Sequence, residues 1–151
     1  MLIKTHLTIT LFFVLILLPF VSHKIIFIVI ALLATYIPDM DSNNSKLGRK
    51  IIFRPLQFFV KHRGAFHSFT FLFLITFIFL MFIPIIALGF FIGYASHLFA
   101  DSLTINGIIP FFPWKRKISW KIRTGSLTEK ILFFILLIVN LFLIVRYIFT
   151  S

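Results

Sequence analysis

Five long apolar stretches constrain the fold of this chain more than any other feature of its sequence. They are Leu7–Val21, Ile25–Ile37, Phe66–Ile83, Pro84–Ala100 and Ile131–Thr150. A helix needs about 20 apolar residues to cross a bilayer, with a range of about 17–25, and the third and fifth stretches fit that length. The chain is 60% hydrophobic, whereas soluble domains average about 45–50%. A soluble core cannot bury so much apolar surface, so the sequence predicts a membrane protein.

The length and the spacing of these stretches predict a single all-α domain over residues 1–151, a polytopic bundle of about five transmembrane helices with interfacial loops. The first two stretches are short, and we expect a tight hairpin or tilted helices there. The first stretch is similar to a secretory signal because Lys4 precedes it. No small-x-small cleavage site follows Phe20, so we expect this helix to be retained.

Lysine and arginine predict the orientation in the membrane. The chain has 15 basic and 4 acidic residues, and each of the two long loops carries six basic residues. With Lys4 this makes thirteen on one face, against Lys24 and Arg146 on the other. The positive-inside rule then places the N-terminus and both loops in the cytoplasm, and the C-terminus outside the inner (cell) membrane. Because the charges flank apolar stretches, we expect anionic lipid as a partner and no nucleic acid.

Histidines and aspartates gather at the ends of the apolar stretches that this orientation places at the cytoplasmic face. Four of the five histidines and three of the four acidic residues lie there: His6, Asp39, Asp41, His62, His67, His97 and Asp101. The chain has no cysteine, so a metal ion would be held by imidazole and carboxylate groups. Ionisable residues inside membrane-spanning segments are energetically costly and are usually functional. We therefore predict a metal site at this face.

The individual motifs each have a plainer alternative. His97 and Asp101 are four residues apart, on one face of a helix, where they can share a metal or simply hydrogen-bond each other. Asp39 and Asp41 follow Pro38, and in an extended segment both face the same way, although turns have this composition too. His6 alone is equally consistent with an incidental histidine near a terminus.

The segment before the third apolar stretch adds a basic candidate. His62 and His67 flank Arg63 and a glycine that permits a turn or a close backbone approach. Arg63 can bind a phosphate with two parallel hydrogen bonds, although a basic stretch beside a membrane helix is the alternative. His23 falls on the opposite face and is excluded. Glu129 completes a capping box with Ser126.

These residues, in this order, resemble the LexA-regulated, membrane-bound metal-dependent hydrolases, the YdjM-like family. The matching segments are His6, Pro38-Asp39-Met40-Asp41, His62-Arg63-Gly64-x-x-His67-Ser68 and Ser96-His97-x-x-x-Asp101, and they extend over nearly the whole chain. The family usually has threonine where this chain has Phe66. The family is distantly similar to zinc-dependent phospholipase C, which also uses an HxxxD ligand pair, so the resemblance implies phosphoesterase chemistry.

We therefore expect a metal-dependent hydrolase of phosphoester, or phospholipid, bonds that uses metal-activated water at the cytoplasmic face. One or two divalent ions, expected to be Zn²⁺, would be held by the seven histidines and aspartates. Asp39, Asp41, His97 and Asp101 are the predicted catalytic residues, and Arg63 would bind the anionic substrate. Two alternatives are a metal or proton transporter, which would spread ionisable groups across the bilayer, and a non-enzymatic adaptor whose basic loops bind lipid or a partner.

Overall fold

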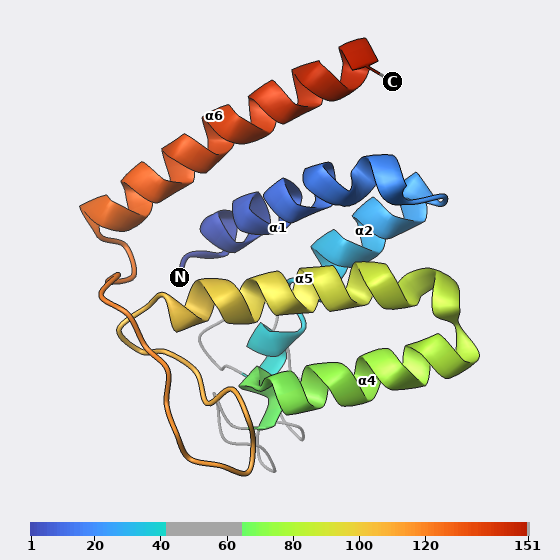
Figure 1. Ribbon diagram of the computed structural model, residues 1–151. Coiled ribbons are helices and arrows are strands. Elements are labelled where there is room, and N and C mark those ends of the chain that lie inside the picture. Colours follow the sequence, from blue (N-terminus) through green and yellow to red (C-terminus); the bar gives the residue numbers. More distant parts are fainter. Residues whose placement is uncertain (42–64, 151) are drawn as a thin grey trace.

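The computed structural model describes residues 1–41 and 65–150, and this part of the chain is a bundle of helices (Figure 1). The predicted all-α fold is confirmed. Three short 3-10 helices, η1, η2 and η4, precede or separate the longer helices. The elements are α1 (Ile3–Leu17), η1 (Leu18–Phe20), α2 (Lys24–Ala34), η2 (Pro38–Asp41), η4 (Ala65–His67), α4 (Phe69–Phe82), α5 (Pro84–Ser102) and α6 (Leu127–Thr150).

Among the described residues, three helices are long and apolar enough to cross a membrane. They cover Ile3–Phe20, Pro84–Ser102 and Leu127–Phe149, with 18, 19 and 23 residues. Helix α2 has 11 residues, in line with its short apolar stretch. Helix α4 has 14 residues and is shorter than its stretch, because Ala65–His67 form η4 and Ser68 caps α4 by accepting a hydrogen bond from Phe71 N.

Helix α5 lies at the centre of the bundle. It contacts α1, α2 and α4, while α6 packs along α1 on the outer side (Figure 1). The contact between α5 and α2 depends on glycine, because a Cβ at Gly93 would lie 2.0 Å from the carbonyl oxygen of Ala31. A Cβ at Gly89 would lie 3.0 Å from the carbonyl oxygen of Phe27. The sequence pattern GxxxG, formed by Gly89 and Gly93, therefore marks a close helix-packing face.

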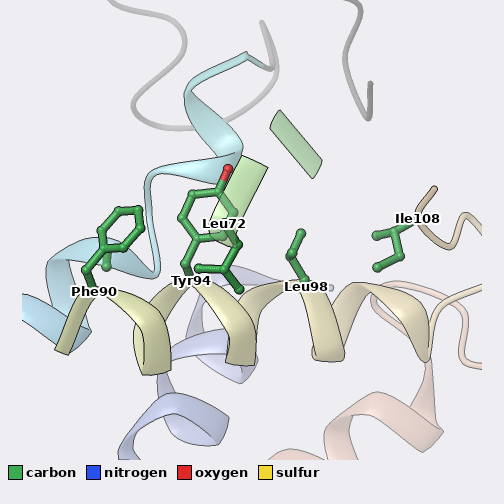
Figure 2. Close-up of a cluster of buried hydrophobic side chains, with 6 residues drawn as sticks. Leu72, Phe90, Tyr94, Leu98 and Ile108 are labelled. Carbon is green, nitrogen blue, oxygen red and sulfur yellow. The ribbon is translucent and has the colours of Figure 1, made fainter. Parts of the chain in front are cut away.

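One face of α5 forms the larger hydrophobic core. Phe90, Tyr94 and Leu98 follow one another at intervals of four residues and pack with Leu72 of α4 and with Ile108 (Figure 2). All five side chains are buried. Residues four apart in a helix lie on the same face, so this row fixes the rotation of α5 about its axis. The same rotation determines where His97, the neighbour of Leu98, is directed.

The segment between α5 and α6 is extended and is held at the end of α5. Ile108 and Ile118 exchange two backbone hydrogen bonds of 2.9 Å, and Thr104 pairs with Ile122. Alternation of apolar and polar residues over 118–123 predicts such an extended segment. The two pairs are isolated β-bridges, and the described residues form no β-strand.

Helix α6 begins where the capping box predicts. Ser126 precedes its first residue, and the Glu129 backbone N–H donates to Ser126 Oγ at 3.4 Å. The Glu129 carboxylate accepts hydrogen bonds of 2.6 Å from the backbone N–H groups of Gly125 and Leu2. Leu2 N–H stands at the start of α1, where helical N–H groups lack partners within the helix. Glu129 therefore caps α6 and joins it to α1.

Candidate metal centre

Residues from four elements meet at one end of the bundle. The start of α1, η2, η4 and the end of α5 lie together there, on the side of the N-terminus in Figure 1. They bring together five of the seven predicted ligands, namely His6, Asp39, His67, His97 and Asp101. The apolar stretch that begins at Leu7 suggested that His6 precedes the first helix. Helix α1 begins at Ile3 instead, so His6 lies inside its first turns.

Asp101 lies at the centre of the cluster because its two oxygens face different partners. Oδ1 lies 3.4 Å from His6 Nε2 and 2.9 Å from the N-terminal ammonium group of Met1. Oδ2 lies 3.9 Å from both His67 Nε2 and His97 Nε2. His97 and Asp101 are thus on one face of α5, at the predicted spacing of four residues, and both are buried.

The orientation of the His97 ring is set by a backbone carbonyl. His97 Nδ1 lies 2.8 Å from the carbonyl oxygen of Thr35, and since a carbonyl only accepts, Nδ1 carries the proton and donates. In a neutral ring Nε2 then keeps a lone pair. This nitrogen is buried and makes no hydrogen bond among the described residues. It faces Asp39 Oδ1 at 3.8 Å and Asp101 Oδ2 at 3.9 Å.

The three imidazole rings pack against one another. The His6 and His97 rings are stacked, with centroids 4.0 Å apart and an angle of 9° between their planes. The His67 ring meets His97 edge-on at 5.7 Å. Two groups of potential ligands result, His6–His97–Asp101 and Asp39–His67–His97, each with its ligand atoms within 4.8 Å of one another. His97 belongs to both groups.

Asp39 is the member of the cluster that is partly open to solvent. Its side chain is 27% exposed, against 0–4% for its neighbours His97 and Asp101. Burial of the rest of the carboxyl group raises its pKa above the ordinary value, while His6 and His67 act in the opposite direction. The free energy of its charged form is therefore high until a cation is placed beside it.

A network of hydroxyl groups supports the ring of His97 from behind. Thr10 Oγ1 lies 2.8 Å from Thr35 Oγ1 and 2.6 Å from Ser96 Oγ, which links α1, the end of α2 and α5. Thr35 Oγ1 donates to the Ala31 carbonyl at 2.9 Å. The network holds the carbonyl group of Thr35 in place, and with it the proton on His97 Nδ1. Groups that orient a metal-binding histidine in this way affect metal affinity strongly.

The position of His67 is fixed by contacts on both sides of it. The Tyr94 hydroxyl donates to the carbonyl oxygen of Phe66, and the Phe69 N–H donates to the Pro110 carbonyl at 2.7 Å. The Phe66 ring packs against Phe71 with a centroid distance of 4.4 Å. Phe66 stands where the family that the sequence resembles usually has threonine. The buried ring of His67 is thereby directed toward Asp101.

Comparison with known proteins identifies the family. The whole chain, residues 1–151, matches the family described as YdjM inner membrane protein. The chain belongs to this family. Among curated relatives, YvsG of Bacillus subtilis is 37% identical over 101 residues, which are 63% of each protein. The inner membrane protein YdjM of Escherichia coli is 33% identical over 109 residues, 66% of this chain and 54% of the relative.

This YdjM-family chain therefore aligns with only about half to two thirds of the length of these relatives. The inner membrane protein YdjM of Shigella flexneri shows the same identity and coverage as that of Escherichia coli. No solved structure matches the chain. The chain is thus a membrane protein of the YdjM inner membrane protein family, with apolar helices that fit insertion into a bilayer.

Three predicted site residues of this YdjM-family chain cannot be placed in the cluster. His62 and Arg63 lie outside the described residues. Asp41 is the last residue of η2, and the structure describes its backbone but not its side chain. The prediction of an extended Asp39–Asp41 segment is wrong. Pro38 opens a 3-10 helix, as a residue without an N–H readily does, and Met40 N–H donates to the Ile37 carbonyl at 3.1 Å.

The structure also shows two supporting residues that the sequence reading missed. Thr10 lies four residues after His6, on the same face of α1, and this spacing is the signal that could have identified it. Thr35 acts through its backbone carbonyl. Every residue type has this group, so the sequence could not identify Thr35. His23 stands directly before α2, at the other end of that helix from the cluster, and its side chain makes no capping hydrogen bond, in line with its exclusion.

Proposed function

We propose that this YdjM-family protein is a membrane-bound, metal-dependent hydrolase of phosphoester bonds, with its active centre at the His–Asp cluster. The observation that carries the proposal is the spacing of the buried ligand atoms. Nε2 of His97 lies 3.8 Å from Asp39 Oδ1 and 3.9 Å from Asp101 Oδ2, and His6 Nε2 lies 3.4 Å from Asp101 Oδ1.

These separations fit a divalent cation better than they fit direct pairing. The two longer distances exceed those of hydrogen bonds. Ligand atoms at about 2.0–2.2 Å from a tetrahedral zinc ion lie about 3.3–3.6 Å from one another, so the cluster needs only a small contraction to bind one. Three imidazoles and two carboxylates are also suitable zinc ligands, in a chain without cysteine.

The tautomer of His97 limits how many ions the described residues can hold. Nδ1 donates to Thr35, so one nitrogen of His97 is left for a metal, and both groups of ligands depend on it. We expect one zinc ion held through His97 and Asp101. A second ion would need further ligands, and Asp39, Asp41 and His62 are the predicted residues that would hold it.

A bound divalent ion would supply an acidified water molecule and would polarise the phosphoryl group of the substrate. The residues of the chain supply the remaining requirements. Asp101 and Asp39 balance the charge of the cation, and the partial exposure of Asp39 favours substrate approach on that side of the cluster. Arg63 is the proposed phosphate-binding residue. The lysine and arginine distribution supports a site that faces the cytoplasm.

The placement of ionisable groups favours hydrolysis over transport. The buried ionisable side chains of the described residues are those of His6, His67, His97, Asp101 and Glu129. The first four belong to the elements that meet at the N-terminal end of the bundle, and Glu129, at the start of α6, accepts from Leu2 N–H at the same end (Figure 1). A proton or metal pathway needs such groups at successive depths of the bilayer.

Elemental analysis of the purified full-length protein tests the metal centre. We expect about one zinc ion per chain in the parent, as in other centres with this ligand set, and loss of the ion in His97→Ala. His23→Ala is the matched control, because it removes a histidine at the other end of α1 and α2 and should keep the ion. Equal metal content in both variants, or none in the parent prepared without chelators, would refute the proposed centre.

Hydrolysis is tested separately, with a chromogenic phosphodiester and with phospholipid in mixed micelles. Activity should disappear with a chelator, return on addition of zinc, and fall at least about 100-fold in His97→Ala. Failure of the parent to hydrolyse any phosphoester while it holds its metal would leave the metal centre standing and refute the hydrolase. Zinc flux into proteoliposomes would then assign the centre to transport.

A further inference from the structure

A groove lies on the segment between α5 and α6, apart from the metal centre. Its volume is about 680 Å³, within the range of small-molecule sites, about 300–1,000 Å³. One part of its lining is aromatic and apolar, and the other part is cationic. The lining includes Pro110, Phe111, Trp114, Arg116, Lys117 and Trp120.

The groove has fixed walls. Ile118 exchanges two backbone hydrogen bonds with Ile108, whose side chain is buried in the core of the bundle. On the other side, the Pro110 carbonyl accepts from Phe69 N–H at 2.7 Å, and the Phe112 carbonyl accepts from Thr70 Oγ1 at 3.1 Å. The two walls are therefore held by α5 and by α4.

The aromatic side chains of the groove are largely exposed. Trp114 is 74% and Trp120 65% exposed, and Phe111 is 52% exposed. Large exposed aromatic groups are unfavourable in water and mark a surface that meets another phase or a ligand. Tryptophan is enriched at the level of the lipid headgroups. The segment joins the ends of two helices that are long enough to cross the membrane, so it lies at one bilayer surface.

The charge of the segment selects the ligand. Between Asp101 and Glu129 the chain has five basic residues and no acidic one. Arg116 and Lys117 lie in the lining itself, and an arginine guanidinium group matches the oxygens of a phosphodiester. A molecule that offers a phosphodiester anion beside an acyl chain satisfies both halves of the lining at the same time.

From this combination we propose that the groove binds the headgroup of an anionic phospholipid from the surrounding bilayer. Arg116 and Lys117 bind the phosphate, while Trp114 and Trp120 lie beside the glycerol and the upper acyl chain. This inference does not depend on metal binding or on hydrolysis. It assigns a lipid-binding position that is separate from the cluster around His97.

The tryptophans themselves provide the measurement. The chain has two tryptophans in total, and both line the groove, so tryptophan fluorescence, excited selectively over tyrosine, reports on this site alone. The full-length protein is reconstituted in phosphatidylcholine, and a small fraction of brominated phosphatidylglycerol or brominated phosphatidylcholine is added. Because acyl-chain bromine quenches nearby tryptophan, the quenching isotherm gives the relative affinity for the two lipids.

We expect brominated phosphatidylglycerol to bind about five-fold or more tightly than brominated phosphatidylcholine, since each basic side chain near an anionic lipid contributes about a factor of five. The double variant Arg116→Gln/Lys117→Gln should bring the ratio close to one. Lys115→Gln/Lys121→Gln is the matched control. It removes the same charge from exposed positions of the same segment, outside the lining, and should keep most of the preference.

Three results would overturn the inference. Equal quenching by the two lipids would show that the groove does not select charge. An equal loss in both double variants would show diffuse attraction to the segment in place of binding in the groove. Complete displacement of brominated phosphatidylglycerol from the groove by inorganic phosphate or by a single-stranded oligonucleotide, in the phosphatidylcholine host, would assign the groove to another anion.

Discussion

Substitution of Gly93 by alanine should damage the metal centre although Gly93 is not a ligand. The new Cβ would lie 2.0 Å from the carbonyl oxygen of Ala31 and 2.8 Å from its carbonyl carbon. Both are backbone atoms and cannot rotate away. Contacts of this kind need about 3.0 Å at the least, so α2 and α5 must separate by about 1 Å at this point.

The separation reaches the site through Thr35, one turn beyond Ala31. The Thr35 carbonyl accepts from His97 Nδ1 at 2.8 Å, and about 1 Å more takes this pair out of hydrogen-bonding range. Overpacking costs about 1–3 kcal/mol and the lost hydrogen bond about 1 kcal/mol. The better helix propensity of alanine returns about 1 kcal/mol. We expect a net loss of about 1–3 kcal/mol and a zinc affinity about 10–100-fold lower.

Gly89→Ala is the matched control. Its Cβ would lie 3.0 Å from the Phe27 carbonyl oxygen and 3.1 Å from Ile30 Cβ, so a shift of a few tenths of an ångström suffices, and the gain in helix propensity offsets it. Thermal unfolding in detergent and zinc titration against a chromophoric chelator measure both variants. If Gly93→Ala matched Gly89→Ala in both melting temperature and zinc affinity, the close packing of α2 and α5 would not be what orients His97.

Three further predictions concern the supports of the cluster. Burial raises the pKa of Asp39 in the folded protein, so the contribution of Asp39 to stability is present below the pKa of the unfolded state and is lost as pH rises through the pKa of the folded state. Asp39→Asn should therefore raise the melting temperature of the metal-free protein at neutral pH. It should also abolish the rise in melting temperature that zinc causes in the parent. Glu129→Ala leaves the N–H groups of Leu2 and Gly125 without their acceptor, and we expect a loss of about 2–3 kcal/mol in the free energy of unfolding. A loss below about 0.5 kcal/mol, less than one ordinary hydrogen bond, would contradict this role. Thr10→Val removes the central hydroxyl of the network but keeps the shape of the side chain, so zinc affinity should fall while melting changes by about 1 kcal/mol; an unchanged affinity would separate the network from metal binding.

The sequence predicts the helices well because their causes are local. The apolar stretches, the break before Pro84 and the capping box at Ser126 are each visible in a few adjacent residues. The start of α1 was placed too late because Ile3–His6 are not uniformly apolar. These residues are helical because Leu2 N–H finds its acceptor in Glu129, 127 positions away.

The candidate site could be predicted by residue type but not by role. The spacing of His97 and Asp101 on α5, and their position at a helix end, follow from sequence alone. The fact that Asp101 faces three histidines with two different oxygens depends on how α1, η4 and α5 pack. The carbonyl of Thr35 carries no side-chain signature, and the 3-10 turn at Asp39 depends on one hydrogen bond to Ile37.

The buried face of α1 has a consequence for the biogenesis of the protein. Thr5, His6, Thr8 and Thr10 point inward, and the Thr8 carbonyl accepts from Asn140 Nδ2 of α6 at 2.9 Å. A newly inserted α1 has neither this partner nor Glu129, since both belong to a helix synthesised more than a hundred residues later. Helix α1 therefore reaches its final state only when α6 is in place, and by then every described ligand of the cluster has been synthesised. Truncated chains that lack α6 would keep the contacts of α1 with α2 and α5 but would leave the Leu2 N–H and the Thr8 carbonyl without their partners on α6.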